Sequence, residues 1–183
     1  MYCKQDGTFN NSKVFKGEYG VTPEGAFVPL QEEIITIKGT VEKTFEVEPL
    51  LRVKWIGEPV VNANGTVTVQ VEITRGTSNA SYQQALQEVW LFVSETDYVF
   101  SGSHSTTHST RLSGAAQVGA LGATLTITSG QPSGPGTGNT QNYFPNYSRK
   151  YFIRVGARTN MTILGQSNIF NYSTIKEITS QAR

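Results

Sequence analysis

Alternation of apolar and polar residues is the clearest signal along this chain. The best run is 66–73, TVTVQVEI, in which valine or isoleucine occupies every second position. Residues 41–47, 51–55 and 151–155 also place their apolar side chains mainly on one face. A period of two is typical of strands that bury one face, and no long amphipathic helix competes with it. The pattern predicts an all-β protein.

The segment 87–94, QEVWLFVS, is apolar on both faces. Aliphatic residues occupy one face, and Trp90 and Phe92 occupy the other. This predicts either a central strand covered on both sides or a strand with exposed aromatic residues. Within so continuous an apolar run, we expect Trp90 to belong to the core.

Turn signals separate further short elements. Asn64-Gly65 predicts a type I′ hairpin, because this dipeptide accepts positive φ at both central positions. Residues 81–87 favour a short helix. ATLTIT at 123–128 predicts a strand, and residues 168–178 are expected to close the sheet. The Gly-, Pro- and Ser-rich stretch Ser129–Asn142 predicts a long mobile loop. About seven short strands separated by turns are typical of a sandwich.

The first 49 residues differ from the remainder. They hold five Lys/Arg against eight Asp/Glu, whereas residues 50–183 hold ten against six. Short strands are predicted at 13–16, 18–22, 33–38 and 41–47, but so few apolar residues make a marginal core. We therefore expect a small β-domain at 1–49 and a sandwich at 50–183.

Composition limits the functional classes. The chain has 183 residues, a formal net charge of +1 and a single cysteine, Cys3. A dedicated nucleic-acid-binding protein would usually carry a basic stripe, so nucleic acid is not an expected partner. One cysteine excludes an intramolecular disulfide and a Cys-based zinc or iron–sulfur site. No apolar run reaches the roughly 18–20 residues of a transmembrane helix.

His104 and His108 stand four residues apart, a spacing that can bind a metal on a helix. Their neighbours are Ser, Thr and Gly, which favour a surface loop instead. We predict no metal site and no cofactor.

No catalytic motif is evident. A Ser/His/Asp triad has only Asp6 and Asp97 to draw on, and no nucleophile elbow is present. Glu32-Glu33 and Glu42/Glu46/Glu48 are typical of a solvated face rather than a glycosidase pair. The glycines of 129–139 lack the Lys-Ser or Lys-Thr of a phosphate-binding loop. We expect a protein that is not an enzyme.

Aromatic residues behind the long loop are the best functional candidates. Sugar rings stack their apolar CH faces on aromatic planes, while amide and guanidinium groups bond the hydroxyls. The predicted glycan-binding residues are Tyr143, Phe144, Tyr147, Asn142, Asn146 and Arg149. Trp90 is the rival anchor. The other interpretation is that the loop aromatics close the end of the sandwich core.

Four strings carry a family resemblance: DGTFNNSKVFKGEYGVTP (6–23), QEVWLFVSETDYV (87–99), YFIRVGAR (151–158) and NIFNYS (168–173). Together they resemble a family of uncharacterised two-domain lipoproteins, named only as a domain of unknown function, from starch-utilisation-like (Sus-like) glycan-uptake loci. The resemblance covers nearly the whole chain.

The resemblance implies a prealbumin-like (carboxypeptidase-regulatory-like) N-terminal domain and an Ig-like C-terminal sandwich. It also implies a cell-surface or outer-membrane protein, lipid-anchored in its full-length form, beside outer-membrane glycan-uptake proteins. From the resemblance we expect a signal peptide, a lipidation box and a first strand of the prealbumin-like domain that the given sequence does not include. Only two residues precede Cys3, so we expect that it is not the lipidated cysteine.

Two functions from different classes remain open. The first is a non-catalytic accessory protein that binds a polysaccharide or oligosaccharide. The second is a scaffold module that binds partner outer-membrane proteins and no sugar. A hydrolase is a third, weaker interpretation.

Overall fold

The computed structural model describes Lys4, residues 7–136 and residues 140–183. Cys3 and Asp6 lie outside the described residues, as do 137–139 of the predicted loop. Nearly all the regular structure is β, so the predicted all-β class is confirmed. Among the described residues, no helix combines the length and the apolar character needed to cross a membrane.

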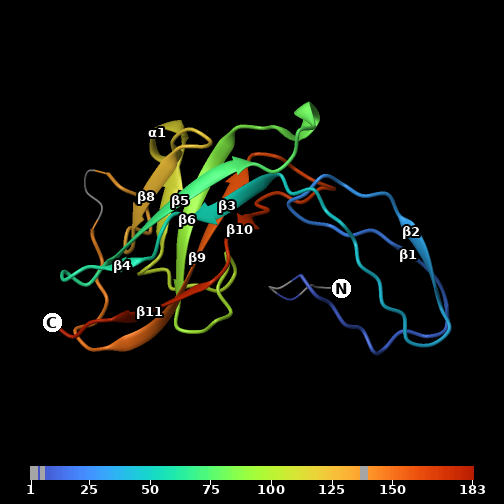
Figure 1. The fold of residues 1–183 in the computed structure, drawn as a ribbon, viewed down its shortest axis with the longest axis horizontal. Helices are drawn as coiled ribbons and strands as arrows, with labels where there is room; N and C mark the ends of the chain where they lie inside the picture. Colours follow the sequence, from blue (N-terminus) through green and yellow to red (C-terminus); the bar gives the residue numbers. More distant parts are fainter. Residues whose placement is uncertain (1–3, 5–6, 137–139) are drawn as a thin grey trace.

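The regular elements follow one another in the order of Figure 1. They are β1 (Gly17–Val21), β2 (Glu33–Ile37), β3 (Leu51–Trp55), β4 (Val60–Val61), β5 (Val67–Arg75), the 3-10 turn Ala80–Tyr82, β6 (Leu86–Ser94), β7 (Thr110–Ser113), α1 (Ala115–Val118), β8 (Thr124–Thr128), β9 (Arg149–Thr159), β10 (Asn171–Tyr172) and β11 (Lys176–Ser180).

Two antiparallel sheets form the sandwich. In one, β5 lies at the centre, with β3 and β4 along one edge and β8 along the other. In the second, β6 pairs with β7 and β9, and β10 and β11 share the far edge of β9. The predicted strands at 51–55, 66–73, 87–94, 123–128 and 151–158 all form, and 168–178 closes the sheet as expected.

The core lies between the two sheets and follows from the alternation. β5 contributes its valines and Ile73, β6 contributes Val89, Leu91 and Val93, and β9 contributes its odd-numbered residues from Tyr151 to Ala157. All of these side chains are buried. The even-numbered residues of β6 and β9 therefore point to the opposite, outer face of their sheet.

The N-terminal segment forms a small sheet of β1 and β2 that lies apart from the sandwich (Figure 1). Hydrogen bonds around Ala26 help to connect it to the sandwich. The backbone N–H of Leu50 donates to the Ala26 carbonyl at 3.0 Å, and the Asn171 side chain donates to the same carbonyl at 2.8 Å. Ala26 is the one buried apolar residue among the described residues before Leu50.

The predicted strands at 13–16 and 41–47 do not form. Neither segment has a partner strand, and Val41 and Val47 remain exposed. Alternation provides a face to bury, but a strand also needs a hydrogen-bonded neighbour. Whether 1–49 and 50–183 fold as separate domains stays a prediction.

Two local predictions were also wrong in detail. Between β4 and β5, only Gly65 of the Asn64-Gly65 pair has positive φ, so the turn is not type I′. The Asn64 side chain accepts hydrogen bonds from the backbone and hydroxyl of Thr66, which stabilises the observed turn instead. The predicted helix at 81–87 is a single 3-10 turn, because β6 already begins at Leu86.

Candidate functional site

The outer face of β6 carries Glu88, Trp90 and Phe92. Strand alternation points them away from the core that Val89 and Leu91 fill. The register then fixes their neighbours on the adjoining strands. Trp90 lies opposite Arg111 of β7, and Glu88 lies opposite Arg158 of β9. A charged pair and an aromatic ring thus meet on one sheet face.

Gly156 provides space for the aromatic rings on this face. It lies opposite Trp90 in the β6–β9 ladder. A Cβ atom there would come within 2.8 Å of Phe92 Cε2 and 2.9 Å of Tyr172 Cε1. Real Cβ atoms do not approach so closely, so the rings could not keep these positions beside a larger residue.

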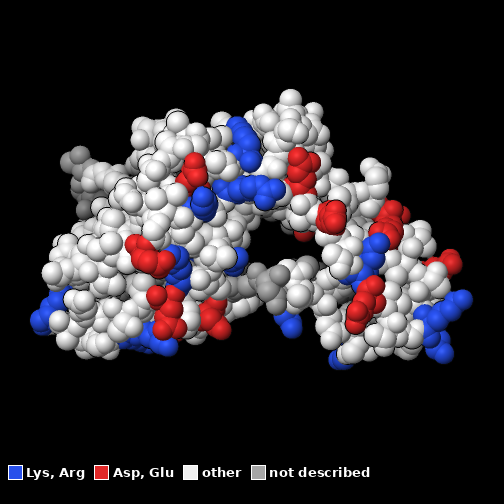
Figure 2. Space-filling view, viewed as in Figure 1, with Lys and Arg blue, Asp and Glu red and all other residues white. Residues whose placement is uncertain are grey.

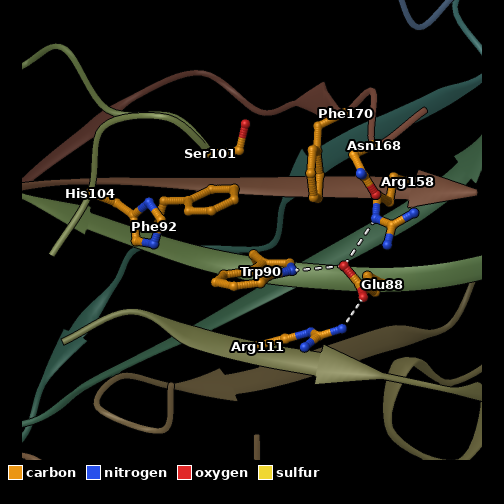
Figure 3. A pocket seen from close by; sticks show the side chains of 9 residues that line it. All are labelled: Glu88, Trp90, Phe92, Ser101, His104, Arg111, Arg158, Asn168 and Phe170. Atoms are coloured by element: carbon orange, nitrogen blue, oxygen red, sulfur yellow. Dashed lines mark hydrogen bonds and ion pairs between the residues drawn. The ribbon is translucent and has the colours of Figure 1, made fainter. Parts of the chain in front are cut away.

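Glu88 accepts hydrogen bonds at both carboxylate oxygens. Arg111 Nη2 donates to Oε1, whereas Arg158 Nε donates to Oε2 at 3.0 Å. Trp90 Nε1 also donates to Oε2, at 3.1 Å. Arg158 is held further by a 2.8 Å bond from Nη1 to the Gln87 side chain. Figure 3 shows the carboxylate between the two guanidinium groups.

Glu88 is ionised at neutral pH despite its burial. Its relative exposure is only 4 %. Burial by itself raises the pKa of the carboxyl. The hydrogen bonds from Arg158, Arg111 and Trp90 together lower it by more than burial raises it, so the pKa lies below its ordinary value. The group is a fixed anion rather than a proton donor.

Aromatic rings form a wall beside these charges. Trp90 and Phe92 stack with centroids 5.3 Å apart and planes inclined by 13°. Phe170 meets Phe92 edge-on at 5.7 Å, and His104 meets Trp90 edge-on at the same distance. Such packing contributes about 0.5–1.5 kcal/mol for each aromatic pair beyond the burial of area. The wall is therefore a rigid surface.

The wall and the charged residues line a pocket of about 280 Å³. Two loops complete it: 95–109 supplies Ser101 and His104, and the segment before β10 supplies Asn168 and Phe170. Asn168 adopts a left-handed backbone with φ 61°, a conformation that asparagine accepts more readily than most residues. The pocket combines apolar ring surface with amide, hydroxyl, guanidinium and carboxylate groups.

The two histidines belong to different surroundings. His104 lines the pocket, and its Nδ1 is covered and has no hydrogen-bond partner among the described residues. His108 packs on Phe144 and Tyr151, and its Nδ1 lies 3.0 Å from Ser105 Oγ. Burial lowers the pKa of His108. Within the part of the chain that the structure describes, no group of three or more His, Cys, Asp and Glu could hold a metal ion.

The structure removes Phe144 from the predicted loop site. Its ring is 2 % exposed and lies 4.5 Å from Tyr151, centroid to centroid, at the end of the core. The prediction that Phe144 contacts a glycan is therefore wrong, because a surface ligand cannot reach it. Tyr143 and Tyr147 are about half exposed, so their predicted role stays a prediction.

The polar residues predicted with them already have partners. Asn142 donates to a backbone carbonyl of the same loop, and Asn146 accepts from the backbone of Arg183. Arg149 forms an ion pair with Glu95. Each of these polar side chains therefore already has a partner within the described chain.

Trp90 is not a core residue. It is partly buried and faces the pocket, so that expectation was wrong. The strand at 87–94 is central in its sheet, which agrees with the first of the two interpretations of this segment. Its outer face is covered by loops rather than by a third layer. Sequence reasoning did not identify the other pocket residues: Glu88, Ser101, Arg111, Arg158, Asn168 and Phe170.

Comparison with known proteins gives a family match for the N-terminal segment and a shared fold for the whole chain. Residues 1–48 match the family described as "Protein of unknown function (DUF3823) N-terminal domain". No curated protein matches the chain.

Three solved structures share the fold over almost the entire chain. A DUF3823 family protein from Bacteroides uniformis is 29 % identical, with a TM-score of 0.82, covering 100 % of this chain and 81 % of its own. A DUF3823 family protein from Bacteroides ovatus is 18 % identical, with a TM-score of 0.64 and the same coverage. A "putative carbohydrate binding protein" from B. uniformis is 23 % identical, with a TM-score of 0.66, covering 97 % of this chain and 80 % of its own. Residues 1–48 therefore match the model of the DUF3823 N-terminal domain, and the whole chain is similar in fold to DUF3823 family proteins of Bacteroides.

Proposed function

We propose that this protein is a non-catalytic glycan-binding protein whose ligand occupies the pocket beside Trp90. The observation that carries the proposal is the wall of Trp90 and Phe170 next to Arg111, Arg158 and Asn168. The partly exposed rings of Trp90 and Phe170 can stack on the CH face of a sugar. The polar groups around them can bond its hydroxyls.

The ligand class has one independent source of support. The B. uniformis relative described as a "putative carbohydrate binding protein" has the same fold, although at 23 % identity the likeness concerns the fold alone. The cellular setting rests on the family resemblance. We place the protein at the cell surface or outer membrane, lipid-anchored in its full-length form, as an accessory to outer-membrane glycan-uptake proteins.

The chemistry of the pocket favours binding over hydrolysis. Most glycosidases use two carboxyl groups, one of which has a raised pKa and donates a proton. Glu88 is the one carboxylate that lines this pocket within the described chain, and its pKa is lowered. Its two oxygens hold the arginines in place instead.

Affinity electrophoresis against a panel of polysaccharides tests the proposal. We expect at least one polysaccharide to retard the wild-type protein. Trp90→Ala and Phe170→Ala should each weaken binding several-fold, because stacking on one ring contributes on the order of 1 kcal/mol. The double variant should lose most of the retardation, with folding checked by the fluorescence of Trp55.

The matched control is the double variant Tyr143→Ala/Tyr147→Ala, which alters the exposed rings of the predicted loop site. It should bind like the wild type. If this variant loses binding while Trp90→Ala and Phe170→Ala retain it, the loop is the binding site and the pocket is not.

A scaffold function is the second candidate, and exposed apolar side chains on the N-terminal segment favour it. Phe15 is 86 % exposed and Ile34 is 62 % exposed, and Val41 and Val47 are also exposed. Among the described residues no third strand pairs with β1 or β2, so both edges of the small sheet can pair with another chain. Retardation by none of the polysaccharides would favour this function.

A further inference from the structure

Charge in the pocket is unevenly balanced. Arg111 and Arg158 each bring a positive charge, and Glu88 brings the single negative charge of the lining. The excess is local, because Lys and Arg are interspersed with Asp and Glu over the face shown in Figure 2. The formal net charge of the whole chain is only +1. Any preference for an anion would therefore arise in the pocket rather than from a broad basic surface.

Both arginines keep unused donors. A guanidinium carries five N–H donors. Arg158 donates to described residues from Nε and Nη1, and Arg111 donates from Nη2, so each keeps donors that these bonds do not use. The side chain of Arg111 is 43 % exposed, so part of its donor edge is open to solvent. Guanidinium edges match planar carboxylates, to which they can donate two parallel hydrogen bonds.

Glu88 offsets one of the two positive charges and leaves the lining with a formal net charge of +1. Its side chain is 5 % exposed, and its oxygens already accept from Arg111, Arg158 and Trp90. It positions the two guanidinium groups, which stand at the pocket wall beside the aromatic rings. Arg111 also lies over the Trp90 ring, 5.7 Å from its centroid, so a stacked sugar on Trp90 would lie close to a cation.

Resting on the proposed function, we propose that the pocket selects sugars that carry a carboxylate, the uronic acids, over neutral sugars. The ring of the sugar stacks on Trp90 or Phe170. Its carboxylate accepts hydrogen bonds from the exposed guanidinium edge of Arg111, beside the largely buried Arg158. A neutral sugar of the same shape keeps the stacking and loses the charge-assisted hydrogen bonds.

Isothermal titration with a matched pair of ligands tests this selectivity. One ligand is an oligosaccharide of galacturonic acid, and the other is the same oligosaccharide after reduction of its carboxyl groups. We expect the acidic ligand to bind about tenfold more tightly, and the preference to shrink as salt is added. Equal binding of both ligands would overturn the selectivity and leave the proposed function intact. Binding of neither, and of no saccharide in the polysaccharide panel, would overturn both.

Variants assign the preference to the pocket. Arg111→Gln should weaken binding of the acidic ligand by a larger factor than binding of the neutral ligand, and so remove most of the preference, because only the acidic ligand loses a charge-assisted hydrogen bond. Arg149→Gln is the matched control, since Arg149 is also paired with a glutamate but lies at the loop site. If Arg149→Gln loses the preference and Arg111→Gln keeps it, the pocket assignment is wrong. A sulfated oligosaccharide that binds as tightly as the uronate would overturn the specificity for carboxylate.

Discussion

Replacing Glu88 by glutamine removes one negative charge while nearly preserving the size of the side chain. The amide keeps one accepting oxygen and gains an NH2 group, which would point its hydrogens at a guanidinium. Hydrogen bonds to charged groups contribute about 1.5–3 kcal/mol each, and loss of one partner of a buried ion pair costs about 3–5 kcal/mol. The side chain of Arg158 is 13 % exposed and that of Arg111 is 43 % exposed. Solvent therefore partly screens the ion pair between Glu88 and Arg111. We therefore expect Glu88→Gln to lower the free energy of unfolding by about 2–3 kcal/mol.

Urea unfolding followed by tryptophan fluorescence measures this loss. The two tryptophans, Trp55 and Trp90, lie in the sandwich, so the signal reports the sandwich and not the small N-terminal sheet. With a urea dependence of about 2 kcal/mol per molar, the midpoint should fall by roughly 1–1.5 M. The matched control is Glu177→Gln, whose partner is Lys150. Both side chains of that pair are at least 49 % exposed, and its loss should cost less than about 1 kcal/mol.

The difference between the wild type and Glu88→Gln should depend on pH in one direction. The pKa of Glu88 is lower in the folded protein than its ordinary value of 4.5. A lowered pKa means that the stabilisation is fully present above the unfolded value and disappears as the pH falls through the folded value. The deficit of Glu88→Gln should therefore be constant near neutral pH and shrink below about pH 4.5. A variant as stable as the wild type at pH 7, or a deficit that is unchanged in acid, would refute the role assigned to the Glu88 carboxylate.

Three further predictions concern the core, the N-terminal segment and the sheet face. Phe144→Ala should cost about 3–5 kcal/mol in urea unfolding, because it empties a buried site, whereas Tyr147→Ala should cost less than about 1 kcal/mol; equal costs would contradict the burial. Amide hydrogens of β1 (Gly17–Val21) should exchange faster than those of β6 (Leu86–Ser94), because almost no apolar burial protects the small sheet; equal protection would contradict this. Gly156→Ala should lower the melting temperature, since its Cβ would lie 2.8 Å from an aromatic carbon, and an unchanged temperature would show that the rings can move.

The sandwich was predictable because its strands encode a single buried face. In β5 every second residue from Val67 to Ile73 is buried, as the alternation predicts. The same period in 41–47 did not produce a strand. In β5 three neighbouring strands satisfy the backbone, whereas 41–47 has no paired neighbour in the structure. Side-chain pattern describes which face a strand could bury, and pairing decides whether the strand exists.

The loop aromatics show why crowding along the chain is a weak guide to a site. Tyr143, Phe144 and Tyr147 are neighbours in sequence, but the fold sends Phe144 into the core and leaves the two tyrosines at the surface. The sequence permitted both roles for each ring. Only the packing against Tyr151 and His108 distinguishes them.

The pocket depends on strand register, which the sequence pattern does not contain. Glu88 meets Arg111 across 23 positions and Arg158 across 70, through two different ladders of β6. A shift of one residue in either ladder would turn the arginine toward the core and away from the carboxylate. The sequence did contain one signal: the acidic residue Glu88 stands within the segment 87–94, which is otherwise apolar on both faces. An anion in that position, largely buried on a sheet face, requires cations on the neighbouring strands, because an unpaired buried carboxylate would be too costly. In 151–158 the alternation places two arginines, Arg154 and Arg158, on the face opposite the apolar residues. Charge complementarity between outer faces could therefore have led from Glu88 to this strand before any register was known, and the register then selects Arg158.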